Sequence, residues 1–153
     1  MTQVAELKSP VQNVEFAELN GSSSVEDRME KMMPDLGVVY VTSITRDGCS
    51  GCMEQKPLFN ELAAKMSGQH SSLVSFARIH IQYSDANVAQ SAEAKRMFRH
   101  GAYPTYMVHV RSRFGPLELY RAIYPSMSDL EKQVGESLEL AEYYKTDAEK
   151  NQR

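Results

Sequence analysis

The chain has 153 residues, of which 42% are hydrophobic and 24% charged, and its formal net charge is -3. A chain of this length can bury one sizeable core, whereas two domains would each have too little apolar surface, so one domain is expected. Neither sign of charge forms a run long enough to follow a phosphate backbone or an anionic bilayer. The composition therefore argues against nucleic acid and membrane surfaces as partners.

The first residues, MTQVAELKSPVQ, lack a basic segment followed by an apolar one. No window approaches the roughly 18 apolar residues that a membrane span requires. The only two cysteines lie in one motif and leave none for a long-range disulfide, which is typical of a reducing compartment. We expect a soluble, unprocessed cytoplasmic protein, or a lumenal or periplasmic one if the chain is a fragment of a longer precursor.

The first predicted elements are a strand over residues 13–19, where Val14 and Phe16 alternate with acidic neighbours, and a short helix capped by Ser24. The segment GVVYVTSI, residues 37–44, is rich in β-branched and aromatic side chains and carries no charge. That composition predicts a central strand covered on both faces. It leads directly into the loop that carries the cysteines.

A longer helix is expected to begin at the cysteines and to end near Gly68, because apolar side chains recur at helical spacing before that glycine. Residues 72–83, SLVSFARIHIQY, then predict a second strong strand. The resulting β-helix-β unit should be parallel with a right-handed crossover. Residues 87–100 predict a further helix.

The last predicted elements are a strand over residues 103–110 and an antiparallel partner over 117–123, joined by a turn at SRFGP. Ser128 and Glu131 have the spacing of a capping box and predict the start of a final helix.

The domain is expected to span residues 13–144. An N-terminal extension over residues 1–12 would precede it, and a polar, frayed tail over residues 145–153 would follow.

The two cysteines, Cys49 and Cys52, lie three positions apart, a spacing that two randomly placed cysteines would show in about one case in a hundred. A thiol in the first turn of a helix meets unsatisfied N–H groups, which lower its pKa from about 8.5 to roughly 3.5–7.5. The second sulfur is within reach of the first, so a mixed disulfide formed by Cys49 can be resolved by Cys52. We predict that Cys49, nearer the exposed loop, attacks and that the shielded Cys52 resolves.

Further features accompany the pair. Pro57 follows Cys52 by five residues and should kink the helix, and AYPTY, with Pro104, opens the third strand. Together with the order of strands and helices, these features resemble the thioredoxin family over about residues 14–140. The resemblance implies an α/β three-layer fold with a mixed central sheet, built from N-terminal β-α-β and C-terminal β-β-α units flanked by helices.

The resemblance also implies a function and a site. It implies a thiol-disulfide oxidoreductase with Cys49 and Cys52 as catalytic residues, without a cofactor, whose partners are protein dithiol or disulfide substrates and a redox partner protein. Pro104 would be cis and face the disulfide, and Tyr103 would offer backbone groups to an extended substrate. Gly48, which stands where the family usually has tryptophan, is placed with them in the substrate-binding site.

The sequence departs from thioredoxin itself at two further points. Ser-Gly fills the dipeptide between the cysteines, and the buried acid of the family falls on Thr42 or Ser43, neither of which can act as a base. Proton transfer would then need water or another group. Arg78 and His80 share one face of the neighbouring strand, so we consider His80 as proton acceptor or Arg78 as thiolate stabiliser.

Other interpretations of the cysteine pair remain. Two thiolates are half a zinc site, but His70, His80, His100 and His109 lack the second short-spaced ligand pair of structural zinc modules, so no metal is expected. A cluster shared across a dimer stays an alternative, and so does a non-catalytic interaction module whose disulfide is at most a regulatory switch.

Residues near the pair and away from it have plainer interpretations. His100 and His109 are expected to be structural, with His100 as a favourable cation at a helix C-terminus. Asp47 is expected to form a solvated loop pair with Arg46. The reduction potential, which spans about -270 to -120 mV among such motifs, stays open.

Overall fold

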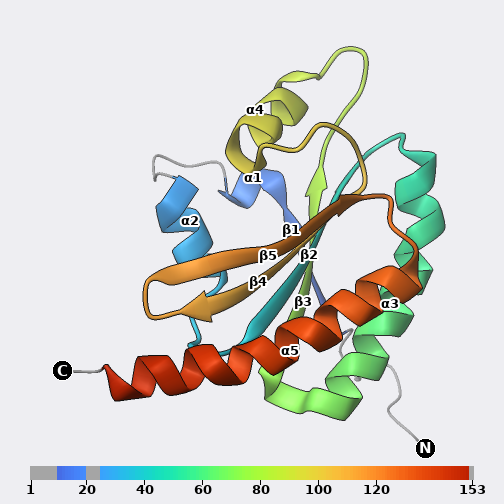
Figure 1. The fold of residues 1–153 in the computed structure, drawn as a ribbon. Helices are drawn as coiled ribbons and strands as arrows, with labels where there is room; N and C mark the ends of the chain where they lie inside the picture. Colours follow the sequence, from blue (N-terminus) through green and yellow to red (C-terminus); the bar gives the residue numbers. More distant parts are fainter. Residues whose placement is uncertain (1–9, 20–24, 152–153) are drawn as a thin grey trace, which may run out of the picture.

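The computed structural model describes residues 10–19 and 25–151, whose strands form one five-stranded sheet between two layers of helices (Figure 1). The strand order is β1-β3-β2-β4-β5. β1 and β2 pair parallel to β3, whereas β4 runs antiparallel to both β2 and β5. The strands are β1 (Val11–Glu15), β2 (Val39–Arg46), β3 (Val74–Ile81), β4 (Thr105–Ser112) and β5 (Gly115–Ile123).

The helices divide between the two faces of the sheet, with α3 and α5 on one side and α1, α2 and α4 on the other (Figure 1). This is the three-layer α/β arrangement that the resemblance implied, with its β-α-β and β-β-α units, and the prediction of fold class is confirmed. The helices are α1 (Phe16–Leu19), α2 (Val25–Met32), α3 (Ser50–His70), α4 (Ala89–Phe98) and α5 (Met127–Lys150), with a 3₁₀ turn at Ser71–Leu73.

The core on the α3 side holds α3 against the sheet through aromatic contacts. The Phe59 ring lies 5.7 Å from that of Phe76 on β3 and 5.4 Å from that of Tyr106 on β4. Each such buried pair contributes about 0.5–1.5 kcal/mol beyond its buried area. β2 is buried at every position except Arg46, as predicted for a central strand. The aromatic contacts fix α3 relative to the sheet. The cysteine loop joins β2, the central strand of that sheet, to α3.

The N-terminal strand differs from its predicted limits. Val11 is buried and pairs with Phe76, so two residues of the expected extension belong to the sheet. Phe16 begins α1 instead of continuing the strand, because its ring packs edge-on against Phe98 of α4. Ser24, the predicted helix cap, lies outside the described residues.

The start of α5 was also predicted wrongly. The N-cap is Ser126, whose hydroxyl oxygen accepts a hydrogen bond from the Asp129 N–H at 3.1 Å. Glu131 does not reach back to Ser128 and instead pairs with Lys65 of α3 at 2.6 Å. The cap therefore lies two residues before the predicted one, and Glu131 links two helices.

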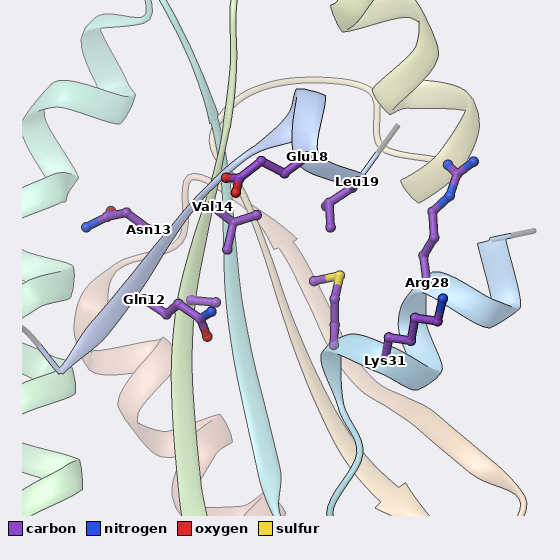
Figure 2. Close-up of a pocket in the computed structure, with 9 residues that line it drawn as sticks. Gln12, Asn13, Val14, Glu18, Leu19, Arg28 and Lys31 are labelled. Atoms are coloured by element: carbon purple, nitrogen blue, oxygen red, sulfur yellow. The ribbon is translucent and has the colours of Figure 1, made fainter. Parts of the chain in front are cut away.

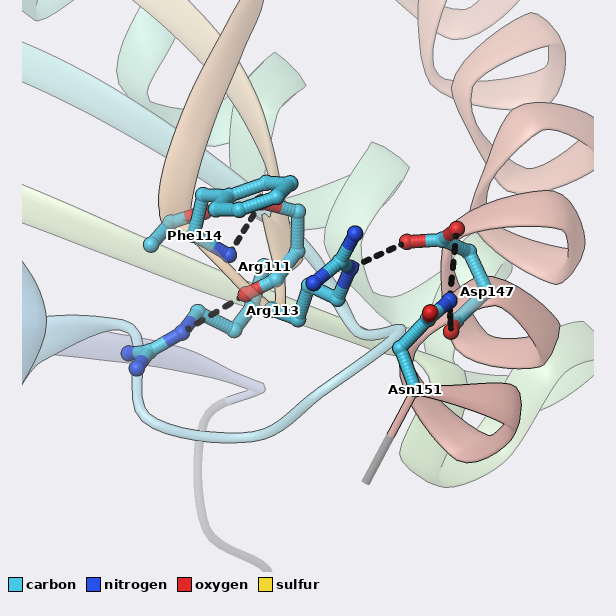
Figure 3. Close-up of polar contacts among 7 residues, drawn as sticks. Arg111, Arg113, Phe114, Asp147 and Asn151 are labelled. Atoms are coloured by element: carbon cyan, nitrogen blue, oxygen red, sulfur yellow. Dashed lines mark hydrogen bonds and ion pairs between the residues drawn. The ribbon is translucent and has the colours of Figure 1, made fainter. Parts of the chain in front are cut away.

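The segment expected to fray is the end of α5. The helix continues to Lys150, and Ala148 is only 1% exposed. The Asp147 carboxylate accepts a hydrogen bond from Arg113 Nε at 2.9 Å, and the Asn151 side chain bonds back to Asp147 (Figure 3). The tail is thereby attached to the turn between β4 and β5.

The two buried histidines are held uncharged. Burial lowers the pKa of both His100 and His109 to about 4, so neither is a cation at neutral pH. The favourable helix-terminal charge expected of His100 is therefore not realised. Within residues 10–19 and 25–151, no helix is both long and apolar enough to cross a membrane.

Ala148→Asp tests whether the end of α5 is part of the packed structure. Burying an unpaired carboxylate in place of a methyl group should lower the free energy of unfolding by about 2 kcal/mol or more. The measurement is urea denaturation followed by circular dichroism. Glu149→Asp at the neighbouring exposed position is the control and should change little. Equal stability of the two variants would mean that the tail is frayed, as the sequence predicted.

Candidate active site

The cysteines lie where the chain turns from β2 into α3. Cys49 is the N-cap of α3, and its sulfur accepts a hydrogen bond from the Cys52 N–H at 3.1 Å. The two residues are joined by a disulfide, with their Cα atoms 5.2 Å apart. The predicted position of the pair at a helix N-terminus is therefore what the structure has, and α3 continues unbroken through Pro57.

Both sulfur-bearing residues are buried to the same degree. Cys49 is 7% exposed and Cys52 is 6% exposed, so the expected difference between an open attacking thiol and a shielded one is absent. The neighbours of Cys49, Gly48 and Ser50, are both exposed. Cys49 is thus buried, but both of its sequence neighbours lie at the surface.

Gly48 makes the turn into α3 possible. Its φ is +69°, a conformation that glycine adopts without the steric cost that a side chain would bring. A Cβ there would meet nothing within 4 Å. The backbone conformation thus explains why a glycine occupies position 48. Its predicted role in substrate binding stays a prediction.

The Tyr103–Pro104 peptide bond is cis, and Pro104 lies against the dipeptide between the cysteines. A Cβ built on Gly51 would lie 3.4 Å from Pro104 Cδ. The Tyr103 hydroxyl shares a 2.9 Å hydrogen bond with Ser91 Oγ, and burial raises the pKa of this hydroxyl. Pro104 and Tyr103 are therefore held beside the motif by the sheet and by α4.

A small cavity of about 120 Å³ opens beside Cys52, between α3 and the ends of β2 and β3. Arg78 and His80, which the sequence singled out, both line it, together with the basic side chains of Arg46 and Lys56. The structure thus brings both candidates to the Cys52 side of the disulfide.

Arg78 is 5% exposed, and its partners in the described part of the chain are neutral. Its guanidinium donates to the side-chain oxygens of Asn13 at 2.9 Å and Asn60 at 3.0 Å, and to the Lys56 carbonyl at 3.4 Å. Burial lowers the pKa of Arg78, which nevertheless starts so high that the group remains protonated at neutral pH. A buried cation that pairs with no carboxylate among the described residues therefore lies near Cys52.

Thr42 and Ser43, on which the resemblance placed the buried acid of the family, lie on opposite faces of β2. Val41 packs in the core under α3 and Ile44 in the opposite one, so Ser43 faces α3 and Thr42 faces away. In the sheet Ser43 lies between Arg78 on β3 and Tyr106 on β4.

The Asp47 carboxylate pairs with His80, whereas Arg46, its expected partner, donates only to the Asp47 backbone carbonyl, at 3.3 Å. His80 Nε2 lies 2.7 Å from Asp47 Oδ1, and the Tyr83 N–H donates to the other carboxylate oxygen at 3.2 Å. The hydrogen bond from the Tyr83 N–H, and to a smaller extent the contact with His80, hold the pKa of Asp47 below its usual value. The guanidinium of Arg46 also lies 4.0 Å over the Tyr83 ring. The imidazole is thus oriented by a carboxylate at the edge of the Cys52 cavity.

Sequence reasoning missed the loop after β5. Tyr124 has a φ of +49°, its N–H donates to the Pro104 carbonyl at 2.9 Å, and its hydroxyl donates to the Glu54 carboxylate. Gln55 Nε2 donates to the Pro125 carbonyl at 2.7 Å. The two contacts to α3 join residues 70 positions apart, so no local pattern could have indicated them.

Other parts of the described chain offer no comparable chemistry. A hollow of about 450 Å³ between β1, α1 and α2 has Gln12, Glu18 and Lys31 in its wall but no cysteine (Figure 2). Across residues 10–19 and 25–151, no three His, Cys, Asp or Glu side chains gather closely enough to hold a metal ion. The disulfide end of the sheet is therefore the candidate active site.

Comparison with known proteins supports the fold. No protein-family model and no curated protein sequence matches the chain. Among solved structures, the thioredoxin of Trichomonas vaginalis is similar, with 9% identity, a TM-score of 0.62 and coverage of 84% of this chain and 98% of its own. That of Trypanosoma brucei brucei is 14% identical, with a TM-score of 0.58 and coverage of 88% and 96%.

A third similar structure is thioredoxin f2 in complex with ferredoxin:thioredoxin reductase, at 14% identity, a TM-score of 0.54 and coverage of 82% and 94%. At these identities the likeness shows the fold alone. The chain has the thioredoxin fold, with a disulfide-bonded Cys-x-x-Cys pair at the start of α3.

Gly51→Ala tests the contact between the dipeptide and the loop after β5. The added Cβ would lie 3.1 Å from two Tyr124 ring carbons, which should lower the free energy of unfolding by about 1–2 kcal/mol. In a Tyr124→Ala background the same change should be neutral, or stabilising by up to about 1 kcal/mol because alanine favours the helix. Urea denaturation of the four proteins in the cycle measures the coupling, and additive effects would contradict the packing described.

Proposed function

We propose that the protein is a thiol-disulfide oxidoreductase that exchanges the Cys49–Cys52 disulfide with protein substrates. The observation that carries this proposal is the Cys49 sulfur at the N-cap of α3, which accepts the Cys52 N–H and is bonded to the Cys52 sulfur. When the disulfide is reduced, the same N–H would stabilise a thiolate more strongly than a thiol, because hydrogen bonds to charged groups are the stronger ones.

The reaction requires only the two sulfurs and protons. In the reducing direction the Cys49 thiolate attacks a substrate disulfide and forms a mixed disulfide, and one substrate sulfur leaves as a thiolate that takes up a proton. Cys52 then loses its proton and attacks the Cys49 sulfur, which releases the second substrate thiolate. Two electrons pass to the substrate, and the protein ends as the disulfide. No cofactor takes part.

The substrate would lie beside Pro104 and Tyr103. Both residues border the dipeptide, and Tyr103 lines the open groove above it. The exposed Gly48 leaves the approach to Cys49 free of a side chain. An extended segment that passes these three residues would bring its own sulfur to Cys49.

Arg78 and His80 would divide the tasks that the family assigns to a buried acid. The Arg78 charge, unneutralised by its neighbours in the described structure, would favour an anionic sulfur on the Cys52 side. His80, oriented by Asp47, would accept the Cys52 proton.

Partners and location follow from the same chemistry. The oxidised protein needs a reductant, and thioredoxin f2 has been solved in complex with ferredoxin:thioredoxin reductase. We propose a redox partner protein of that class, and a reducing compartment such as the cytoplasm.

Cys52→Ser tests the function. This variant should attack substrate disulfides but be unable to resolve them, so it should accumulate mixed disulfides visible on non-reducing gels. The wild type should turn over a model protein disulfide, insulin, with dithiothreitol as reductant. Cys49→Ser is the control and should do neither. If the wild type has no turnover and Cys52→Ser traps nothing, the fold serves as an interaction module instead.

His80→Asn and Arg78→Gln test the separate roles proposed for His80 as proton acceptor and Arg78 as thiolate stabiliser. Loss of the proton acceptor should slow release from a preformed Cys49 mixed disulfide about tenfold or more at pH 7 and leave the first attack unchanged. Arg78→Gln should instead raise the pH at which reduced Cys49 and Cys52 are alkylated by iodoacetamide. Stopped-flow release and alkylation profiles measure the two effects. Identical profiles for both variants would contradict the division of roles.

A further inference from the structure

The disulfide is bordered on its exposed side by a groove of about 500 Å³, lined by Ser50, Gly51, Glu54, Tyr103 and Tyr124. We call it the Glu54 groove. It runs over the dipeptide between the cysteines, with α3 on one side and the loop after β5 on the other. A substrate segment placed against Pro104 would therefore have a side chain in this groove.

The two sides of the disulfide differ in charge. The cavity beside Cys52 has the basic side chains of Arg46, Lys56 and Arg78 in its wall, whereas among the described residues Glu54 is the only charged side chain that lines the groove. Glu54 is exposed and its Oε1 accepts a hydrogen bond from the Tyr124 hydroxyl, so its other oxygen, Oε2, can meet a partner. A negative charge at the exposed side favours a cationic group on the substrate.

The tyrosines restrict where that cation can bind. At Tyr103 the guanidinium of Arg46 and the ammonium of Lys95 already lie 5.5 Å and 5.7 Å from the ring centre. Tyr124 is 48% exposed, and no cation lies over its ring in the described structure. An aromatic ring beside a carboxylate is the arrangement that binds a cation through both the ring face and the charge.

The loop holds Tyr124 in this position before any substrate arrives. Its N–H is bonded to Pro104, its hydroxyl to Glu54, and its ring edge packs on Gly51. The same hydroxyl contact raises the pKa of Tyr124, as a bond to an ionised carboxylate does. The wall of the groove is therefore preorganised, and binding needs little rearrangement.

We propose that the Glu54 groove selects protein substrates that carry a lysine or arginine beside the reactive cysteine, with the cation against Tyr124 and Glu54. This inference rests on the proposed function, since it assigns the substrate class of that same site. One exposed ion pair with a cation–π contact should favour a basic over an acidic neighbour about fivefold in kcat/KM at low salt. The preference should shrink as ionic strength rises.

The test uses two disulfide-bridged peptides that differ only in a Lys or a Glu next to one cysteine. Their kcat/KM ratio is measured for the wild type, Glu54→Gln and Glu54→Lys, so that any general change in activity cancels within each protein. The ratio should be about five for the wild type, near one for Glu54→Gln, and inverted for Glu54→Lys. Glu61→Gln, an exposed glutamate further along α3, is the matched control and should keep the wild-type ratio.

An unchanged ratio in Glu54→Gln would overturn the proposal, as would a wild-type ratio of one. If no protein turns over either peptide or a neutral small disulfide, the proposed function fails separately. The preference is then read from the equilibrium binding of the same peptides with serine in place of cysteine. Tighter binding of the Lys peptide that is lost in Glu54→Gln supports the groove assignment, and equal binding of both peptides overturns it.

Discussion

The hydrogen bond from the Cys52 N–H to the Cys49 sulfur is the contact on which the site depends, because it places the reactive sulfur at the positive end of α3. This geometry is a consequence of packing. The Phe59 ring fixes α3 on β3 and β4, and Gly48 turns the chain so that the helix begins immediately after β2. A shift of α3 along the sheet would move the N–H groups and the sulfur together, but it would separate them from Pro104 and Arg78.

Arg78, on β3 beneath the start of α3, is a buried cation, and burying it costs free energy of desolvation. Removing a guanidinium from water costs several kcal/mol. Here hydrogen bonds to two side-chain amides and a backbone carbonyl offset part of that cost, and none of these three partners carries a negative charge. Those bonds also join β1, β3 and α3, so the residue has a structural role. Under the proposed function, a sulfur that becomes anionic on reduction would be the counterpart of its charge. The thiolate state and the stability of this layer would then be coupled.

The sequence predicted what local patterns determine. The β-α-β unit follows from uncharged β-branched runs on either side of a helical apolar repeat, and the cysteines could be placed at the helix start for that reason. The pairing of Asp47 with His80 depends on the register of β2 on β3, in which Thr45 lies opposite His80, and no local pattern gives a register. The helical tail was missed because one buried alanine, Ala148, is hidden among polar neighbours. The cap at Ser126 was missed because Ser128 has the same chemistry and better spacing.

The structure separates the groups that would set the reactivity of the sulfurs from those that would meet a partner. Arg78 and His80 lie under α3 on the Cys52 side, whereas Glu54, Tyr103 and Tyr124 lie on the exposed side of the dipeptide. A change of charge in the groove would act most strongly on a bound substrate, whereas Arg78 lies on the Cys52 side of the motif. Substrate preference and thiolate stability would therefore depend mainly on different residues. A fold whose core fixes the sulfurs can thus serve different partners through substitutions on α3 and the loop after β5 alone.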